Sequence, residues 1–444
     1  MPNVSMDTIV ALCKRRGFVF PGSEIYGGMA NSWDYGPLGV ELKNNIKQAW
    51  WRRFVQARLD MVGIDAALIM NPKVWEASGH LETFTDPLVE CRECHERYRA
   101  DQTDLNAACE KCGNKGTFTE PASFQLMFKT FVGPAEESAN VAYFRPETAQ
   151  AMFVNFPQVL QTSRKRLPFG IAQIGKAFRN EITPGNFIFR TREFEQMEIE
   201  YFVREENWEE TFTYWLGEMK AWIAFCGIDE HRIHDLEVPS EELAHYSKRT
   251  VDIEFDFPFG RKELYGLAYR TDFDLSNHAK HSGEDMAYTD PVSGEKVVPH
   301  VIEPTFGVDR TLLAMLVSAY DEEEVPTADG GVETRIVLRL PKSLAPIKIA
   351  ILPLSKKDEL AHIARPLAER LATRWRVDYD ETQSIGRRYR RQDEIGTPYC
   401  VTVDFETIND EHVTVRDRDT MQQERVAIEK LGKYFDDKFH HALT

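Results

Sequence analysis

The sequence predicts an α+β fold with two domains and one small insert. Two strand-like segments joined by a short loop, residues 170–181 and 192–202, alternate charged or small residues with bulky apolar ones. After about Ala345, strand-like runs alternate with a helical pattern, which is typical of a separate small α/β domain. Two closely spaced cysteine pairs mark the insert. A chain of 444 residues is long enough to build more than one hydrophobic core.

The first elements of the body are mostly helical. The N-terminal residues, 1–18, have amphipathic spacing and no apolar core of a signal peptide. Residues 37–62 predict a second helix, and residues 64–72 predict a short strand that ends at a proline. A third helix is expected over residues 146–164, and Pro157 should kink or shorten it because proline lacks the amide donor.

The insert, about residues 89–118, is predicted to hold zinc. Its cysteines follow the spacing C-x2-C-x14-C-x2-C, and two such knuckles can complete a tetrahedron of thiolates around one ion. The alternative is four reduced surface thiols. The predicted ligands are Cys91, Cys94, Cys109 and Cys112.

The rest of the body continues with a segment expected to be a helical insert, about residues 205–248. Strands rich in aromatic residues are predicted over residues 251–274, and a strand turns into a helix near Phe306. In the second domain, strands and a helix are followed by a last helix expected over residues 420–431.

Composition excludes several classes of protein. The net charge of −17 argues against a general nucleic-acid binder, and DNA is not an expected partner. No run of eighteen apolar residues exists, so no membrane contact is expected and the predicted location is the cytoplasm. Residues 345–444 are close to neutral, and their basic run suits RNA contact or a solvated loop. That run contains Arg387, Arg388, Arg390 and Arg391.

One face of the two central strands carries charge. Side chains two residues apart in a strand share a face, so Arg179 and Glu181 lie together, as do Phe194 and Glu198. Such a face could hold a ligand with a phosphate, an aromatic base and a cation, or it could simply meet water. The stretch EPTFGVDR adds Arg310 at a helix start, where a cation calls for an anionic partner.

These residues carry a resemblance to class II aminoacyl-tRNA synthetases. FRNE with its following strand is similar to the second motif of that class, GVDR to the third, and the segment from Pro37 to Pro72 to the first, dimer-forming motif. The strings YGPLGVELKNN, FRPETAQAMFVNF, TREFEQMEIEYF and GRRYRRQDEIGTPYCVTVD resemble the homodimeric bacterial glycyl-tRNA synthetase family, and the similarity spans nearly the whole chain.

The resemblance implies a six- or seven-stranded antiparallel sheet flanked by helices in a catalytic domain of residues 1–344. An anticodon-binding α/β domain would follow at 345–444. The implied enzyme is a homodimeric ligase that activates glycine with ATP and Mg²⁺ and transfers it to tRNA(Gly). The alternative from another class is a non-catalytic tRNA-binding accessory protein on a synthetase scaffold.

The same resemblance implies the site residues. Arg179, Glu181 and Arg310 would be catalytic, and Glu263 would also bind magnesium. The residues expected to bind ATP are Arg179, Asn180, Glu181, Phe189, Arg192, Phe194, Glu263, Leu264, Gly307 and Arg310. Those expected to bind glycine are Arg99, Glu147, Glu198, Arg270, Glu303 and Thr305. Thr305 departs from the serine that is usual in the family, which puts an extra methyl group in the pocket.

Overall fold

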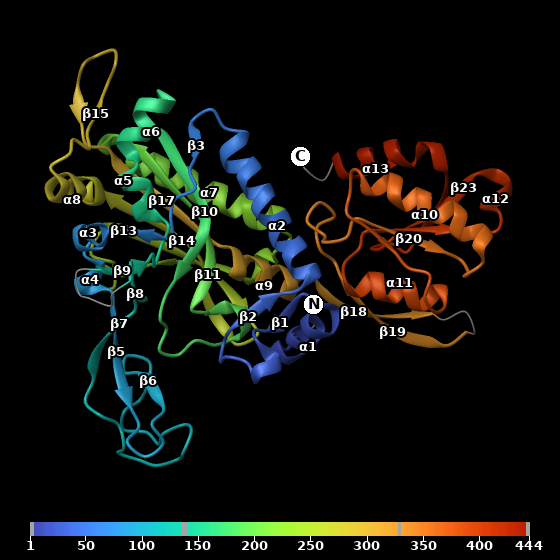
Figure 1. Ribbon diagram of the computed structural model, residues 1–444, viewed down its shortest axis with the longest axis horizontal. Coiled ribbons are helices and arrows are strands. Elements are labelled where there is room, and N and C mark those ends of the chain that lie inside the picture. Colours follow the sequence, from blue (N-terminus) through green and yellow to red (C-terminus); the bar gives the residue numbers. More distant parts are fainter. Residues whose placement is uncertain (1–3, 135–139, 327–329, 441–444) are drawn as a thin grey trace.

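The computed structural model describes residues 4–134, 140–326 and 330–440. A large body occupies one side of the molecule and a smaller domain, drawn in orange and red, the other (Figure 1). Within the described parts of the chain, no helix combines the length and the hydropathy of a membrane span.

A seven-stranded sheet forms the centre of the body. All neighbouring strands are antiparallel except for the last pair, in which the edge strand β3 runs parallel to β10. The sheet order is β12 (Ile233–Glu237), β13 (Arg249–Phe257), β14 (Gly260–Thr271), β17 (His300–Gly307), β11 (Glu193–Val203), β10 (Phe169–Phe178) and β3 (Met61–Gly63). The predicted antiparallel sheet is confirmed.

Helices cover both faces of this sheet (Figure 1). On one face, Met197 and Ile199 of β11 belong to the largest hydrophobic cluster, together with Trp50 and Trp215. The helices there are α2 (Pro37–Trp51), α7 (Trp208–Phe225) and α9 (Val308–Ala319). The other face carries a smaller cluster around Phe202. Its helices are α5 (Ala149–Val154), α6 (Phe156–Ser163) and α8 (Phe273–Ser282).

Three body elements differ from the prediction. The helix expected over residues 37–62 ends earlier, and a π-helical turn, Arg52–Gln56, leads into β3. A Cβ at Gly63 would lie 2.1 Å from the Trp51 ring, so only glycine lets β3 pack there. The strand expected over residues 64–72 is reduced to β4 (Ile69–Met70), which pairs outside the main sheet. Residues 205–248 are not a purely helical insert, because they also supply the edge strand β12.

The predicted break of the third helix is confirmed, since α5 and α6 meet at Asn155 and Pro157 lies in the first turn of α6.

Small sheets, hairpins and short helices surround this core. Further elements are α1 (Met6–Arg16), β1 (Val19–Pro21), β2 (Trp33–Tyr35), α3 (Pro72–Ala77), α4 (His80–Thr83), β8 (Lys129–Phe131), β9 (Val141–Phe144), β15 (Tyr288–Thr289), β16 (Lys296–Val297), β18 (Tyr320–Pro326) and β19 (Val332–Leu338).

The insert protrudes from the lower end of the body in Figure 1. It is built on a three-stranded sheet, in which β5 (Thr85–Glu90) pairs with β6 (Arg97–Arg99) and with β7 (Ala122–Gln125). A β-bridge between Cys91 and Phe118 closes the insert, near the bounds of about 89–118 that the sequence predicts.

The second domain has a mixed five-stranded sheet. Its order is β21 (Val377–Tyr379), β20 (Ile349–Pro353), β22 (Tyr399–Val403), β23 (His412–Asp417) and β24 (Gln423–Ala427). Its helices are α10 (Asp358–Ala372), α11 (Ile385–Glu394), α12 (Thr407–Asp410) and α13 (Leu431–His440). The helix expected over residues 420–431 is wrong: Met421, with a left-handed φ of 57°, turns the chain back, and β24 pairs with β23.

Candidate active site

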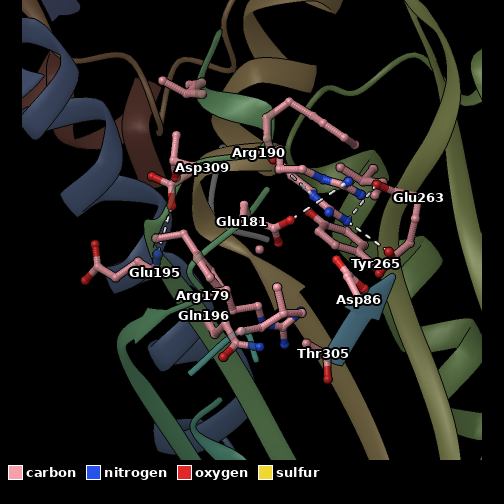
Figure 2. A pocket seen from close by; sticks show the side chains of 18 of the residues that line it. Asp86, Arg179, Glu181, Arg190, Glu195, Gln196, Glu263, Tyr265, Thr305 and Asp309 are labelled. Carbon is pink, nitrogen blue, oxygen red and sulfur yellow. Dashed lines mark hydrogen bonds and ion pairs between the residues drawn. The ribbon is translucent and has the colours of Figure 1, made fainter. Parts of the chain in front are cut away.

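A cavity of about 320 Å³ opens on the face of the central sheet that the alternation pattern marked as charged (Figure 2). Strands β11, β14 and β17, the loop between β10 and β11, and the start of α9 form its walls. Eight of the ten residues expected to bind ATP line it: Arg179, Glu181, Phe189, Phe194, Glu263, Leu264, Gly307 and Arg310.

Two arginines, Arg179 and Arg310, line this cavity. The Arg179 Nε donates to the carbonyl of Pro146 at 3.0 Å, and its guanidinium lies 5.3 Å from the centre of the Phe194 ring. The Arg310 guanidinium lies 4.4 Å from the ring centre of Phe189 and contacts Glu263 at 3.1 Å. Both planar groups are therefore held in fixed orientations, which suits binding of phosphate oxygens.

Two of the expected ATP residues do not line the cavity. Asn180 lies beside it, and its backbone amide donates to the carbonyl of Leu126 at 2.7 Å. Arg192 points to a neighbouring hollow, where it contacts the carbonyl of Ala30 at 3.4 Å. The reason is the strand start: β11 begins at Glu193, so Arg192 does not follow the alternation of the strand.

The residues expected to bind glycine fall into two groups. Arg99 and Thr305 line the cavity, Arg99 reaching it from β6 and Thr305 from β17. The other four are buried behind its floor: Glu147, Glu198, Arg270 and Glu303 are between 1% and 7% exposed.

Glu198 connects the cavity to this buried group. Thr305 Oγ1 donates to Glu198 Oε1 at 2.9 Å, and Gln196 Nε2 donates to the same oxygen at 3.3 Å. The hydroxyl of Thr148 donates to the other oxygen. Burial, followed by the charge of Glu147, raises the pKa of Glu198.

Arg270 is the guanidinium in the buried group. It donates to Glu303 at 2.6 Å and to Asp274 at 2.8 and 2.9 Å, and it stacks 3.7 Å from the ring centre of Tyr246. Glu147 is paired with His80, whose Nε2 lies 3.3 Å from its carboxylate. Carboxylates outnumber cations here, so the group favours binding of a further cation.

Sequence reasoning missed several members of this group. Asp274, His80 and Gln150 lie on helices far apart in the sequence and were assigned no role, although Gln150 belongs to the string FRPETAQAMFVNF. Strand alternation puts Glu200 on the same face as Glu198, but the resemblance assigned it no role. Arg145 was also missed: a Cβ at Gly175 would lie 2.1 Å from its Nη2, so this glycine makes room for a buried arginine.

A second missed feature is the junction behind Arg310. Asp309 receives hydrogen bonds from Lys43 Nζ at 2.8 Å, from the amide of Glu195 at 2.8 Å and from the hydroxyl of Tyr35. Lys43 also pairs with the Glu195 carboxylate at 2.9 Å. This junction joins α2, β11 and the start of α9, and so it fixes the position of the helix turn from which the Arg310 side chain extends.

The four predicted cysteine ligands come together. Their Sγ atoms all lie within 4.8 Å of one another, and Cys91 to Cys112 and Cys94 to Cys109 are 3.7 Å apart. A tetrahedral site with zinc–sulfur bonds of about 2.3 Å requires sulfur separations of about 3.8 Å. The donor set therefore fits zinc.

The arginine run of the second domain forms a helix, α11, and its members differ. Arg388 is 1% exposed, and its guanidinium donates to the carbonyls of Pro353, Asp380 and Leu354, so it is not available to RNA. Arg390 and Arg391 are partly exposed and are ion-paired, to Glu333 and to Asp380. The Arg387 side chain is exposed. The expectation for Arg388 is corrected, because helical periodicity turns it into the domain.

Comparison with known proteins decides the family. Residues 131–319 match the family described as tRNA synthetase class II core domain (G, H, P, S and T), and residues 348–438 match the anticodon binding domain family. A glycine–tRNA ligase from Thermobifida fusca is 53% identical, with 98% of each chain covered. The chain belongs to the glycine–tRNA ligase family.

Other members of the glycine–tRNA ligase family are similar to this chain in identity and coverage. The protein from Streptomyces coelicolor is 55% identical over 97% of each chain, and that from Geobacillus thermodenitrificans is 54% identical over 98% of this chain and 97% of its own. Among solved structures, a prolyl-tRNA synthetase from Cryptosporidium parvum has a TM-score of 0.62 at 15% identity, covering 99% of this chain and 78% of its own. That likeness shows the class II fold.

Proposed function

We propose that this chain activates glycine with ATP to form glycyl-adenylate and then transfers the glycyl group to the 3' end of tRNA(Gly). The observation that carries this proposal is one cavity with Arg179 and Arg310 on its walls and a buried, carboxylate-rich group behind its floor. Membership of the glycine–tRNA ligase family supports it.

In the first step, a carboxylate oxygen of glycine attacks the α-phosphorus of ATP, and the bond to pyrophosphate breaks. No protein nucleophile takes part, so positioning and charge neutralisation lower the barrier. Arg179 is suited to the α-phosphate and the glycine carboxylate, and Arg310 to the γ-phosphate end. Phe194 would stack on adenine, and Glu181 would accept from its amino group.

The ammonium group of glycine belongs at the carboxylate-rich end of the site. Glu147, Glu198 and Glu303 would surround it, and Thr305 would set the available space through its contact with Glu198. A pocket of this kind rejects larger amino acids by steric overlap, so no editing site is needed.

Magnesium would be held next to the phosphates by Glu263. A Cβ placed on Gly266 would lie 3.8 Å from a Glu263 oxygen and 3.9 Å from an Asp252 oxygen. The carboxylates of Glu263 on β14 and of Asp252 on the adjacent β13 therefore both lie next to Gly266. Oxygen donors of this kind fit magnesium. When bound, the ion would neutralise phosphate charge.

We also infer a structural zinc ion at the four cysteines, because the insert has too few residues for a core of its own. The body of residues 1–344 would act as the catalytic domain and residues 345–444 as the anticodon-binding domain, in the cytoplasm where charged tRNA is used. In that domain, the partly or fully exposed Arg387, Arg390 and Arg391 are the proposed RNA contacts.

A homodimer is proposed from the resemblance of residues 37–72 to the dimer-forming motif. The neighbouring segment exposes apolar side chains, with Ile25 88% and Tyr26 86% exposed, which supports association with a second copy. A fully active monomer in analytical ultracentrifugation would contradict this.

The test of the function is amino-acid-dependent exchange of labelled pyrophosphate into ATP, measured for all twenty amino acids and repeated with Arg179→Ala. Exchange with glycine alone is expected, and the substitution should reduce it by about a thousandfold because a charge-neutralising group is lost. Arg166→Ala, at an exposed position, is the matched control. Absence of exchange with every amino acid would favour the accessory-protein alternative.

A further inference from the structure

Glu200 lies deepest in the carboxylate-rich group and has no assigned role. It follows Glu198 by two residues on β11, so both side chains point to the same face of the sheet. Glu200 is 0% exposed, and neither of its carboxylate oxygens has a hydrogen-bond partner among the described residues. A buried carboxylate that accepts no hydrogen bond is strongly disfavoured in its charged form.

The neighbours of Glu200 make its ionisation still less favourable. Carboxylate oxygens of Glu198, Glu200 and Glu303 lie within 4.8 Å of one another. The cation of the group is directed elsewhere, because Arg270 donates to Asp274 and Glu303 and not to Glu200. The charged groups that face Glu200 come from four elements: Glu198 on β11, Glu303 on β17, Arg270 on β14 and Asp274 on α8. Glu147, with its partner His80 on α4, belongs to the same buried group and acts on Glu198 and Glu303.

Carboxyl groups this close cannot all be ionised without a cation between them, so they titrate as a coupled unit. Burial, and then the negative charge of Glu303, raises the pKa of Glu200 well above its ordinary value. Burial also raises the pKa of Glu303 to about 8, although Arg270 opposes that shift. Geometry and charge agree that one proton stays in the group near neutral pH.

We propose that Glu200 and Glu303 share one proton while the amino-acid site is empty, and that this proton passes to solvent when an ammonium group binds beside Glu198 and Glu303. The inference rests on the proposed function and deepens it, because it assigns Glu200 as a positioning residue that couples glycine binding to proton release. The incoming positive charge takes the place of the proton, so the net charge of the group is preserved.

Calorimetric titration of the full-length chain with glycine, in two buffers of different ionisation enthalpy at the same pH, tests this. The unmodified chain should release about one proton per glycine near pH 7. Glu200→Gln should release none, because a neutral glutamine leaves Glu303 as the one carboxylate of the pair, with Arg270 as its partner, and no proton is needed to separate two like charges. Glu193→Gln is the matched control on the same strand, since the Glu193 side chain is 52% exposed. Glycolate, with a hydroxyl in place of the ammonium, should release no proton.

The outcomes separate the two proposals. Glycine binding without proton release by the unmodified chain, or equal release by Glu200→Gln, would overturn the role of Glu200 and leave glycine activation standing. Absence of any glycine binding would instead contradict the proposed function.

A second measurement uses only the unmodified chain, should Glu200→Gln fail to fold. If a proton must leave, the Kd for glycine should fall by up to tenfold per pH unit as the pH rises from about 6 toward about 8. A Kd that stays constant over this range would overturn the proposal.

Discussion

At the scale of single residues, Thr305 is proposed to limit what the cavity accepts. Its hydroxyl donates to Glu198 at 2.9 Å, and its methyl group would narrow the space for a side chain on the substrate. Thr305→Ser keeps the hydrogen bond and should raise alanine-dependent exchange by about tenfold relative to glycine, because one methyl group is worth that much discrimination.

A second substitution, Thr305→Val, separates the effect of side-chain volume at this position from the effect of its hydrogen bond to Glu198. Thr305→Val keeps the volume but leaves Glu198 without this donor, so the exchange rate with glycine should fall by about tenfold or more. An unchanged alanine-to-glycine ratio in Thr305→Ser, measured by pyrophosphate exchange, would show that the methyl group does not limit the pocket.

Arg310 is proposed to hold ATP through its shape as much as its charge. Its guanidinium lies over Phe189 and pairs with Glu263, and lysine offers neither the planar group nor two donors in one plane. Arg310→Lys should therefore raise the KM for ATP by about tenfold or more and leave the KM for glycine nearly unchanged. Equal shifts in both KM values would show that Arg310 does not act on ATP selectively.

At the scale of elements, the junction at Asp309 holds α2, β11 and α9 together. Asp309→Asn would leave the buried Lys43 with one carboxylate in place of two, which should lower the free energy of unfolding by about 2 to 4 kcal/mol. Because Arg310 is the next residue, the KM for ATP should rise as well. Asp34→Asn, at an exposed position on β2, is the control; urea unfolding and exchange kinetics measure both effects.

The insert is linked to the cavity through β5 and β6, and Asp86 of β5 lines the cavity. Arg99 reaches the cavity from β6, which pairs with β5 directly before Cys91. Cys94→Ser should remove about one zinc per chain by elemental analysis, loosen this sheet, and raise the KM for substrates without abolishing exchange. His95→Ala, at a 76% exposed side chain, should retain the metal. Full metal-free activity and unchanged proteolytic resistance would rule out the structural role.

At the scale of the whole molecule, buried arginines attach the second domain to the hairpin of β18 and β19. Asp393 on α11 receives hydrogen bonds from Arg335 of β19 at 2.8 Å and from Arg416 of β23 at 2.9 Å. Burial alone would raise the pKa of Asp393, but these two arginines hold it below its ordinary value. The stability from this group is therefore complete above about pH 4 and is lost as the pH falls through the lowered value.

Asp393→Asn should accordingly lower the free energy of unfolding by about 3 kcal/mol at neutral pH, because Arg416 and Arg335 lose a buried carboxylate partner and only Arg335 keeps another, Glu323. The difference between the variant and the unmodified chain should shrink in acid, where Asp393 itself becomes protonated. Thermal unfolding of both chains across this pH range measures it, and a difference independent of pH would contradict the assignment.

The strand alternation was enough to predict the face of β11 that carries Phe194 and Glu198, and the cysteine spacing was enough to predict the gathering of four cysteines; the antiparallel sheet was implied by the resemblance to class II synthetases. The first two features are local: side chains two apart share a strand face, and two pairs of cysteines on tight turns reach one ion. The turn at Met421 and the short strand β3 were not predictable in this way, because strand pairing overrode the local pattern.

Only the tertiary structure decided which charges meet. Register between β11 and β17 brings Glu200 next to Glu303, helix packing brings Asp274 to Arg270, and helical periodicity buries Arg388. By itself, the sequence determined the faces, the motifs and the class of fold, because these depend on spacing along one segment. The buried network behind the cavity depends on neighbours from five segments, and its burial and balance of charge exist only after those segments pack.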